Sequence, residues 1–336
     1  GLVQLSQEKY KEAQNTFNNL MRSYPNHPKM YLATFSLGVA YAREKNWKKA
    51  APYFQNVVEK FSKSELADRA VYECAWCEKG MNRKEQAVER YKYLLKTYPK
   101  SNLAIKAKTE LAELTFDAKK FDEVIAQLKQ TLTEIKDEKL KEQTLYRLGT
   151  ACFNKGDFEE SAKTFEALLE KYPKSSFWAS ARFHAGESRM KLNEMTAARE
   201  HFSAASKVDK KKLPELAESV LMRLGEVQGL TKQWTESAKT YNEFLRVFPE
   251  SKWTKRARFG LGWAFDKQKD FNSAMLEYRK IVAAKGKDEL SARAQFQIGE
   301  CLFAQKKYDD AVQELVRVDV NYGYKDWTAK ATLEMG

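Results

Sequence analysis

The chain has 336 residues, of which 43% are hydrophobic and 31% are charged, and its formal net charge is +13. This composition provides enough apolar material for a buried core and places the chain among globular proteins. No stretch approaches the roughly 18 consecutive apolar residues of a membrane span. No signal peptide is visible at the start either, although a mature or trimmed chain would look the same, so the compartment stays open.

A small residue recurs along the whole chain, and we call these positions the small column. They are Gly1, Gly38, Ala75, Ala112, Gly149, Gly186, Gly225, Gly262, Gly299 and Gly336. Successive members lie 37 residues apart, except for one 39-residue step between Gly186 and Gly225. Such self-similarity is the signature of a repeat protein.

Each repeat reads in the same order from its small residue onward. In the second repeat the small residue Gly38 is followed by the large Trp47, then by the small Ala50, and then by the aromatic Phe54. Spacings of three and four place side chains on one face of a helix. We therefore expect a helix A around the small column, a short turn, and a helix B that carries the later positions.

Glycine destabilises a helix interior, so its recurrence indicates the close approach of a second helix. We expect the small residues of the two helices to pack against each other, with the large side chains filling the space beside them.

Proline ends four of the repeats, and a serine follows each of the last three prolines after two residues. The prolines are Pro25, Pro99, Pro173 and Pro249, and the serines are Ser101, Ser175 and Ser251. Because proline cannot continue a helix, we expect it to end helix B. The serines are expected to be N-caps of the next helix A. A further proline, Pro52, sits early in a helix B and is expected to start or bend it.

These columns resemble the tetratricopeptide repeat, whose signature is a small residue, an alanine, an aromatic and a proline at fixed positions. The segments Leu37-Gly38 to Phe54 and Leu148-Gly149 to Pro173 match that signature well. The resemblance covers essentially the whole chain and implies an all-α, right-handed superhelical solenoid of about nine helix-turn-helix units. It departs from the family in its period of 37 residues rather than the usual 34.

The resemblance also implies a function, a protein-protein interaction scaffold that binds a partner peptide or domain in a concave groove lined by the A helices. The long period and the Tyr-Pro-x-Ser turns look most like bacterial cell-envelope proteins, namely outer-membrane-assembly lipoproteins and the periplasmic protein associated with the Tol-Pal system. A periplasmic location is therefore favoured, with a cytoplasmic one left open.

The resemblance places two sets of side chains towards the groove, at three residues before and one residue after the small column. The groove residues that we expect to bind a partner are Phe35, Tyr72, Trp76, Tyr146, Phe183, Arg256, Phe259, Trp263 and Phe296. Packing between neighbouring helices is the alternative for the Phe and Tyr residues. Arg256 and Arg258, near Trp253 and Trp263, form the most prominent basic-aromatic cluster.

The 39-residue step contains residues 207–214. We expect one continuous repeat domain made of sub-arrays 1–208 and 209–336, with residues 207–214 forming either a two-residue loop extension, the favoured interpretation, or a hinge between the sub-arrays. Because Gly1 and Gly336 both fall in the middle of a helix A, we expect this chain to be part of a longer protein. Membrane association would then arise only through segments outside it or through partners.

No catalytic site is expected, since the chain has three histidines and lacks a phosphate-binding loop or a nucleophile motif. Cys74-Ala75-Trp76-Cys77 has the spacing of a redox motif but falls inside a helix. No metal, cofactor or small-molecule substrate is expected. The net positive charge favours an acidic partner. Nucleic-acid binding is disfavoured because the acidic Glu187 and Glu226 interrupt the groove. A non-catalytic helical platform of a larger enzyme remains an alternative.

Overall fold

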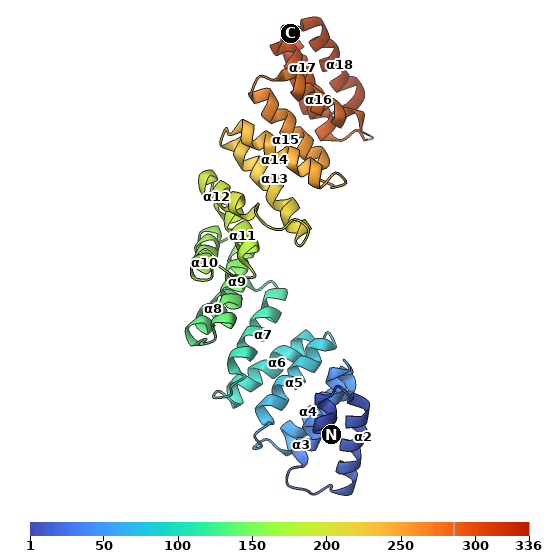
Figure 1. Ribbon diagram of the computed structural model, residues 1–336, viewed down its shortest axis with the longest axis vertical. Helices are drawn as coiled ribbons and strands as arrows, with labels where there is room; N and C mark the ends of the chain where they lie inside the picture. Colours follow the sequence, from blue (N-terminus) through green and yellow to red (C-terminus); the bar gives the residue numbers. More distant parts are fainter. Residues whose placement is uncertain (285, 336) are drawn as a thin grey trace. The chain divides into compact units, whose positions relative to one another are not determined.

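The computed structural model describes residues 1–284 and 286–335, and every regular element in these ranges is a helix (Figure 1). This confirms the predicted all-α fold class. The chain forms two compact units, Gly1–Gly156 and Asp157–Gly336. The sub-array boundary predicted after residue 208 does not coincide with this division and lies inside the second unit. A hinge at residues 207–214 stays a prediction.

In the first unit the odd-numbered helices are A helices and the even-numbered ones are B helices, coloured blue to green in Figure 1. They are α1 (Leu2–Ser6), α2 (Tyr10–Ser23), α3 (Met30–Arg43), α4 (Trp47–Lys60), α5 (Ala67–Gly80), α6 (Lys84–Thr97), α7 (Ala104–Asp117), α8 (Phe121–Glu134) and α9 (Glu138–Lys155).

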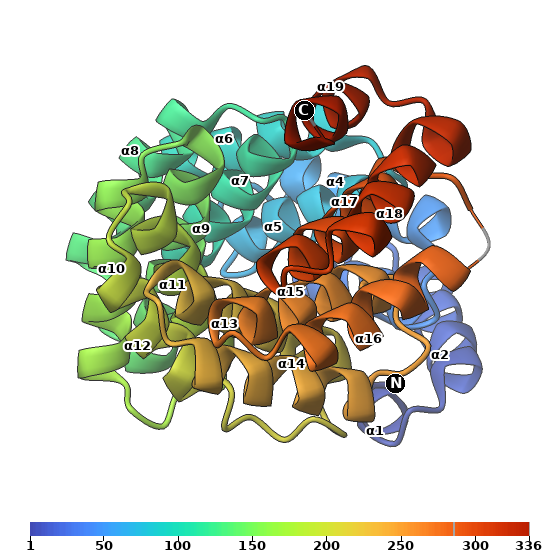
Figure 2. The same ribbon diagram turned by 90° about the horizontal axis from the view of Figure 1, so that it is seen from above.

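The second unit continues the same alternation, with B helices now coming first. Its helices are α10 (Phe158–Lys171), α11 (Trp178–Lys191), α12 (Met195–Ala205), α13 (Pro214–Leu230), α14 (Trp234–Val247), α15 (Thr254–Lys267), α16 (Phe271–Ala283), α17 (Glu289–Ala304), α18 (Tyr308–Tyr322) and α19 (Lys325–Met335). Figures 1 and 2 both show α13 to α18 as neighbours packed in chain order.

The small column is explained by an aromatic ring of helix B in the same repeat. A Cβ added to Gly38 would lie 2.8 Å from Phe54 Cε1, and one added to Gly262 would lie 2.7 Å from Tyr278 Cε1. Both rings are fully buried. The aromatic ring of helix B therefore packs directly on the glycine of helix A. This corrects the expectation that the large side chains fill the space beside two small residues.

The turn between helix A and helix B contains a residue in the left-handed region, seven positions after the small column. Lysine often holds this position, as at Lys45, Lys232, Lys269 and Lys306, whose φ angles are 59°, 60°, 63° and 62°. Gly156 gives the turn the residue type that this conformation favours most, and Asn82 and Asn193 are of a type that tolerates it well. The turns with lysine at this position are therefore held in place by the packing of the helices on either side.

We predict that Lys306→Gly raises the free energy of unfolding by about 1 kcal/mol, because a non-glycine residue is strained in the left-handed region. The adjacent Lys307→Gly is the control, since Lys307 has an ordinary φ of −94°. Urea titration followed by circular dichroism measures both variants. Equal stabilisation by the two substitutions would contradict the account of this turn.

The turns from helix B to the next helix A follow the predicted proline pattern in part. Helices α6 and α14 end two residues before Pro99 and Pro249, as expected. Ser251 Oγ accepts the N–H of Trp253, but it lies three residues before α15 and so is not its N-cap. Its hydroxyl donates instead to Glu218 of α13, the preceding helix A. The serine thus links successive A helices. Pro52 lies within α4, which begins five residues earlier, so it does not start that helix.

Candidate functional site

Three of the predicted groove residues are core residues. Phe35, Phe259 and Phe296 are only 4%, 7% and 7% exposed. The ring of Phe35 packs edge-on against Phe54, with 5.3 Å between centroids, and Phe259 packs against Tyr278 at 5.4 Å. For Phe35 and Phe296 the structure supports packing between helices rather than an open groove, whereas Phe259 is packed and also lines a surface pocket.

Tyr72, Tyr146 and Phe183 are half-buried and line surface hollows. Tyr72 contacts Tyr91 at 5.6 Å between ring centroids, and Phe183 contacts Phe202 at 5.8 Å. Tyr146 lines a hollow of about 170 Å³. Tyr72 and Phe183 therefore combine packing between helices with a place in a surface hollow.

The first unit contains a pocket of about 290 Å³ between α3, the start of α4 and α5. We call it the first tryptophan pocket and define it by Trp47, Arg69, Tyr72, Glu73 and Trp76. Trp76 is 38% exposed, which is high for so large an apolar side chain. Burial raises the pKa of Glu73, and the nearby Arg69 and Arg43 oppose that shift.

The second unit contains a pocket of about 410 Å³ lined by α13, α14, α15 and α17. We call it the second tryptophan pocket and define it by Glu226, Trp234, Arg256, Phe259 and Trp263. It brings together three of the residues predicted from the sequence, Arg256, Phe259 and Trp263. Sequence reasoning missed Trp234, as it missed Trp47 and Arg69 in the first pocket.

A lysine of the same helix covers one indole in each pocket. Lys79 Nζ lies 5.3 Å from the ring centroid of Trp76, and Lys267 Nζ lies 4.2 Å from that of Trp263. These cation–π contacts restrain the rings, so less conformational entropy is lost when a ligand packs on them.

Acidic groove residues are engaged in ion pairs that connect successive A helices. Arg223 Nε lies 2.8 Å from Glu187, and Arg223 also pairs with Glu226 at 2.9 Å. In the first unit Lys79 bridges Glu110 and Glu113 at 2.9 and 3.0 Å. These surfaces therefore alternate in sign along the A helices, whereas a continuous phosphate-binding stripe needs clustered positive charge.

The basic-aromatic cluster expected near Trp263 is only partly assembled. Arg256 lies 5.8 Å from the ring centroid of Trp253 and lines the second tryptophan pocket. Arg258 points to another neighbour and pairs with Glu277 of α16 at 2.9 Å. The two arginines are separated because residues two apart lie on different sides of a helix.

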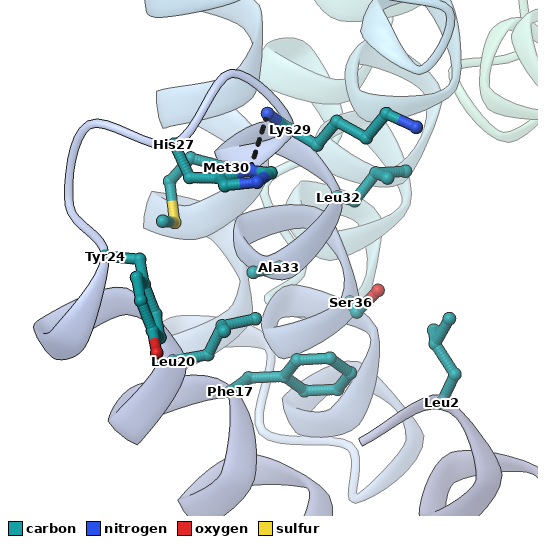
Figure 3. A pocket seen from close by; sticks show the side chains of 10 residues that line it. All are labelled: Leu2, Phe17, Leu20, Tyr24, His27, Lys29, Met30, Leu32, Ala33 and Ser36. Carbon is teal, nitrogen blue, oxygen red and sulfur yellow. Dashed lines mark hydrogen bonds between the residues drawn. The ribbon is translucent and has the colours of Figure 1, made fainter.

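A further hollow, of about 390 Å³, lies between α1, α2 and α3 (Figure 3). Its lining is mostly apolar and includes Phe17, Leu20, Tyr24 and Met30. None of the predicted groove residues lines it, and it lacks the combination of indole and guanidinium groups found in the tryptophan pockets.

The four cysteines are buried, and none of them is joined in a disulfide. Burial raises the pKa of the Cys74 and Cys77 thiols to about 12, so both stay protonated near neutral pH. Across residues 1–284 and 286–335, no group of three or more His, Cys, Asp or Glu residues is placed to hold a metal ion. Within the same ranges no helix is long and apolar enough to cross a bilayer.

Sequence models of the tetratricopeptide repeat match residues 1–65, 231–289 and 293–322. A model of the tetratricopeptide repeat-like domain matches residues 69–229. Together these matches leave few residues of the chain uncovered. The chain belongs to the tetratricopeptide-repeat family. No curated protein sequence matches it significantly.

Solved structures similar to this chain include one protein named for the tetratricopeptide repeat (TPR). A TPR protein from Parabacteroides merdae is 16% identical, with a TM-score of 0.49 over 80% of this chain and 99% of its own. MamA from Desulfovibrio magneticus is 16% identical, with a TM-score of 0.44 over 53% of this chain and 92% of its own. The structure of Naa15/Naa10 bound to HypK-THB is 14% identical in sequence, with a TM-score of 0.48. The match covers 96% of this chain and 50% of that one.

One polar cluster inside the TPR helices of the second unit depends on a histidine. His201 of α12 is 8% exposed, and its Nε2 lies 3.1 Å from Glu166 of α10. Its Nδ1 lies 3.3 Å from Arg182 of α11, and Arg189 of α11 binds Glu166 with two hydrogen bonds of 2.8 and 2.6 Å. A neutral ring that donates to Glu166 and accepts from Arg182 satisfies both contacts.

We predict that this histidine makes the TPR array less stable in acid. Burial lowers the pKa of His201 below its ordinary value of 6.5, and the positive charges of Arg182 and Arg189 add to this effect against the attraction of Glu166. The pKa of His201 is therefore lower in the folded chain than in the unfolded one. For this reason the neutral ring contributes stability that is present above pH 6.5 and is lost as the pH falls below that value.

The measurement is the urea midpoint between about pH 7 and pH 5. His201→Gln should show a smaller loss of stability than the unsubstituted chain over this interval. His27→Gln, at an exposed turn, should leave the loss unchanged. An identical pH dependence of stability in all three proteins would show that His201 does not cause the loss of stability in acid.

Proposed function

We propose that this TPR protein is a non-catalytic scaffold that binds a segment of a partner protein on the surface of its A helices. The observation that carries the proposal is the pair of tryptophan pockets. Each places two indole rings, a third aromatic ring and a guanidinium group around one hollow. Tryptophan and arginine are the residues that most often dominate the free energy of protein-protein binding.

The partner that fits this surface best is a peptide or domain with acidic character, since the net charge of +13 and the pocket arginines favour negative groups. The setting that we propose is a bacterial cell-envelope assembly. Support for it comes from the Tyr-Pro-x-Ser turns and the long repeat period alone. Cell fractionation with an antibody against the chain tests the setting independently of binding.

The binding proposal is tested with the purified chain as bait in an extract of its source cells. Proteins captured by the unsubstituted chain are compared with those captured by Trp76→Ala/Trp263→Ala. The matched control is Tyr93→Ala/Leu276→Ala, which removes exposed apolar side chains from the B helices α6 and α16. Circular dichroism first verifies that both double variants are folded.

A partner whose affinity falls about tenfold or more with the tryptophan variant, and stays unchanged with the control, is the expected result. Failure of the unsubstituted chain to capture any protein would overturn the scaffold function. A partner that both variants retain equally would place binding on another surface of the array.

A further inference from the structure

The two tryptophan pockets are built from the same repeat positions. Trp47 and Trp234 both stand nine residues after a small-column position, and Trp76 and Trp263 both stand one residue after the next such position. The remaining defining residues correspond as well. Arg69 and Arg256 lie six residues before that second position, and Tyr72 and Phe259 lie three residues before it.

No other pair of adjacent repeats carries this set. The three remaining tryptophans, Trp178, Trp253 and Trp327, stand eight or nine residues before the small column. At the position of Trp76 and Trp263, most other repeats have a glutamate, as at Glu113, Glu187 and Glu300. The recurrence is therefore specific to two places, one in each compact unit.

Each pocket also has guanidinium groups that form no ion pair in the described part of the chain. Arg43 and Arg69 make no ion pair within 4 Å among the described residues of the first unit, and the guanidinium carbon of Arg69 lies 5.2 Å from the ring centroid of Phe35. Arg293, which lines the second pocket, likewise makes none among the described residues. It stacks over Phe259 with its guanidinium carbon 4.4 Å from the ring centroid. The arginine in the second pocket that does form a pair, Arg256, has one contact of 3.3 Å with Glu226 and stays half exposed.

The charges at each pocket sum to a positive value. Arg43 and Arg69 outnumber Glu73 in the first pocket, and Lys232, Arg256 and Arg293 outnumber Glu226 in the second. A carboxylate that approaches an arginine held against an aromatic ring can form a two-pronged hydrogen bond. The indoles beside it provide an apolar platform for a neighbouring side chain.

We infer that the two tryptophan pockets are equivalent sites for one peptide motif, an apolar side chain next to an Asp or Glu, which the partner presents twice. This inference rests on the proposed scaffold function and specifies its partner. Two weak sites that bind linked copies of one motif give an affinity that exceeds that of either site.

The first test selects peptides from a random dodecapeptide library displayed on phage, with the full chain as the target. Peptides that share an acidic residue beside Leu, Ile, Met, Phe or Trp are expected. Trp76→Ala and Trp263→Ala should each still select the same motif, whereas the double variant should lose about tenfold or more of the enrichment. Different motifs on the two single variants, a motif without an acidic residue, or undiminished selection by the double variant would overturn the inference.

The second test examines charge. Arg69→Glu/Arg256→Glu should weaken binding of a selected peptide about tenfold or more. Lys96→Glu/Lys239→Glu makes the same change in net charge at exposed positions of the B helices α6 and α14, and it should weaken binding much less. Equal losses would mean that overall charge, not the pocket, attracts the peptide, which contradicts the proposed site.

The third test joins two copies of the selected peptide by Gly-Ser linkers of about 10 to about 60 residues. The best linker should bind the unsubstituted chain about tenfold or more tighter than one copy. The gain should vanish in either single tryptophan variant. The absence of a gain at every linker length would overturn the paired-site inference.

These results separate the inference from the proposed function. A chain that captures a partner protein unaffected by the tryptophan substitutions remains a scaffold, but its pockets are not the motif sites. A chain whose pockets bind only phosphatidylserine vesicles, with no peptide selected, contradicts the inference as well.

Discussion

Replacing Phe54 with alanine is expected to lower the free energy of unfolding by about 3–5 kcal/mol. The ring is fully buried, stands on Gly38, and packs against Phe35 at 5.3 Å between centroids. Its loss removes a central contact between α3 and α4 in this repeat. The urea midpoint, followed by circular dichroism, measures the effect.

A double-mutant cycle tests whether the ring and the glycine act together. Gly38→Val alone forces a side chain into a ring that would lie 2.8 Å from the new Cβ. In the Phe54→Ala background the same substitution enters the vacated space. Its cost should therefore fall by at least about 1 kcal/mol. Additive effects would show that the glycine is required for some other reason.

Gly262→Ala is expected to lower the free energy of unfolding by about 1–3 kcal/mol through overpacking. The added Cβ would lie 2.7 Å from Cε1 of Tyr278, whose ring is fully buried and cannot swing into solvent. Urea titration of the variant measures the loss.

The control substitution, Gly229→Ala, is expected to change the free energy of unfolding in the opposite direction. At Gly229, in α13, an added Cβ meets nothing closer than Ser237 Oγ at 3.6 Å, an ordinary contact. Alanine is the better helix former, so Gly229→Ala should raise the free energy of unfolding by about 0.5–1 kcal/mol. Destabilisation of similar size at both glycines would contradict the assignment of Gly262 to the ring contact.

Much of the fold could be predicted from the sequence because the repeat shows each constraint several times. The proline after helix B correctly predicted where that helix ends. The glycine in helix A correctly predicted the close approach of a second helix. The left-handed turn residue was missed because lysine, as at Lys269, gives no local sign of that conformation. Packing of the flanking helices imposes it.

The candidate site was predicted less completely. Trp76 and Trp263 were found because one column of helix A was examined by itself. Trp47 and Trp234 belong to the turn side of the preceding repeat, so their part in the pockets follows only once two repeats are in contact. A comparison of all tryptophan positions against the small column could have found them. The burial of Phe35 could not be read from its type, since an aromatic residue serves equally in a core or a groove.

Photo-crosslinking from inside the pockets tests the central claim most directly. Arg43 and Leu230 occupy equivalent positions, five residues after the small column, and line the first and second tryptophan pockets. A photoreactive phenylalanine analogue at either position should form an adduct with the same partner protein in source-cell extract. The same analogue at Tyr93 or Leu276, on the B helices, should form none. Adducts from the B-helix positions but not from the pockets would contradict binding through the tryptophan pockets.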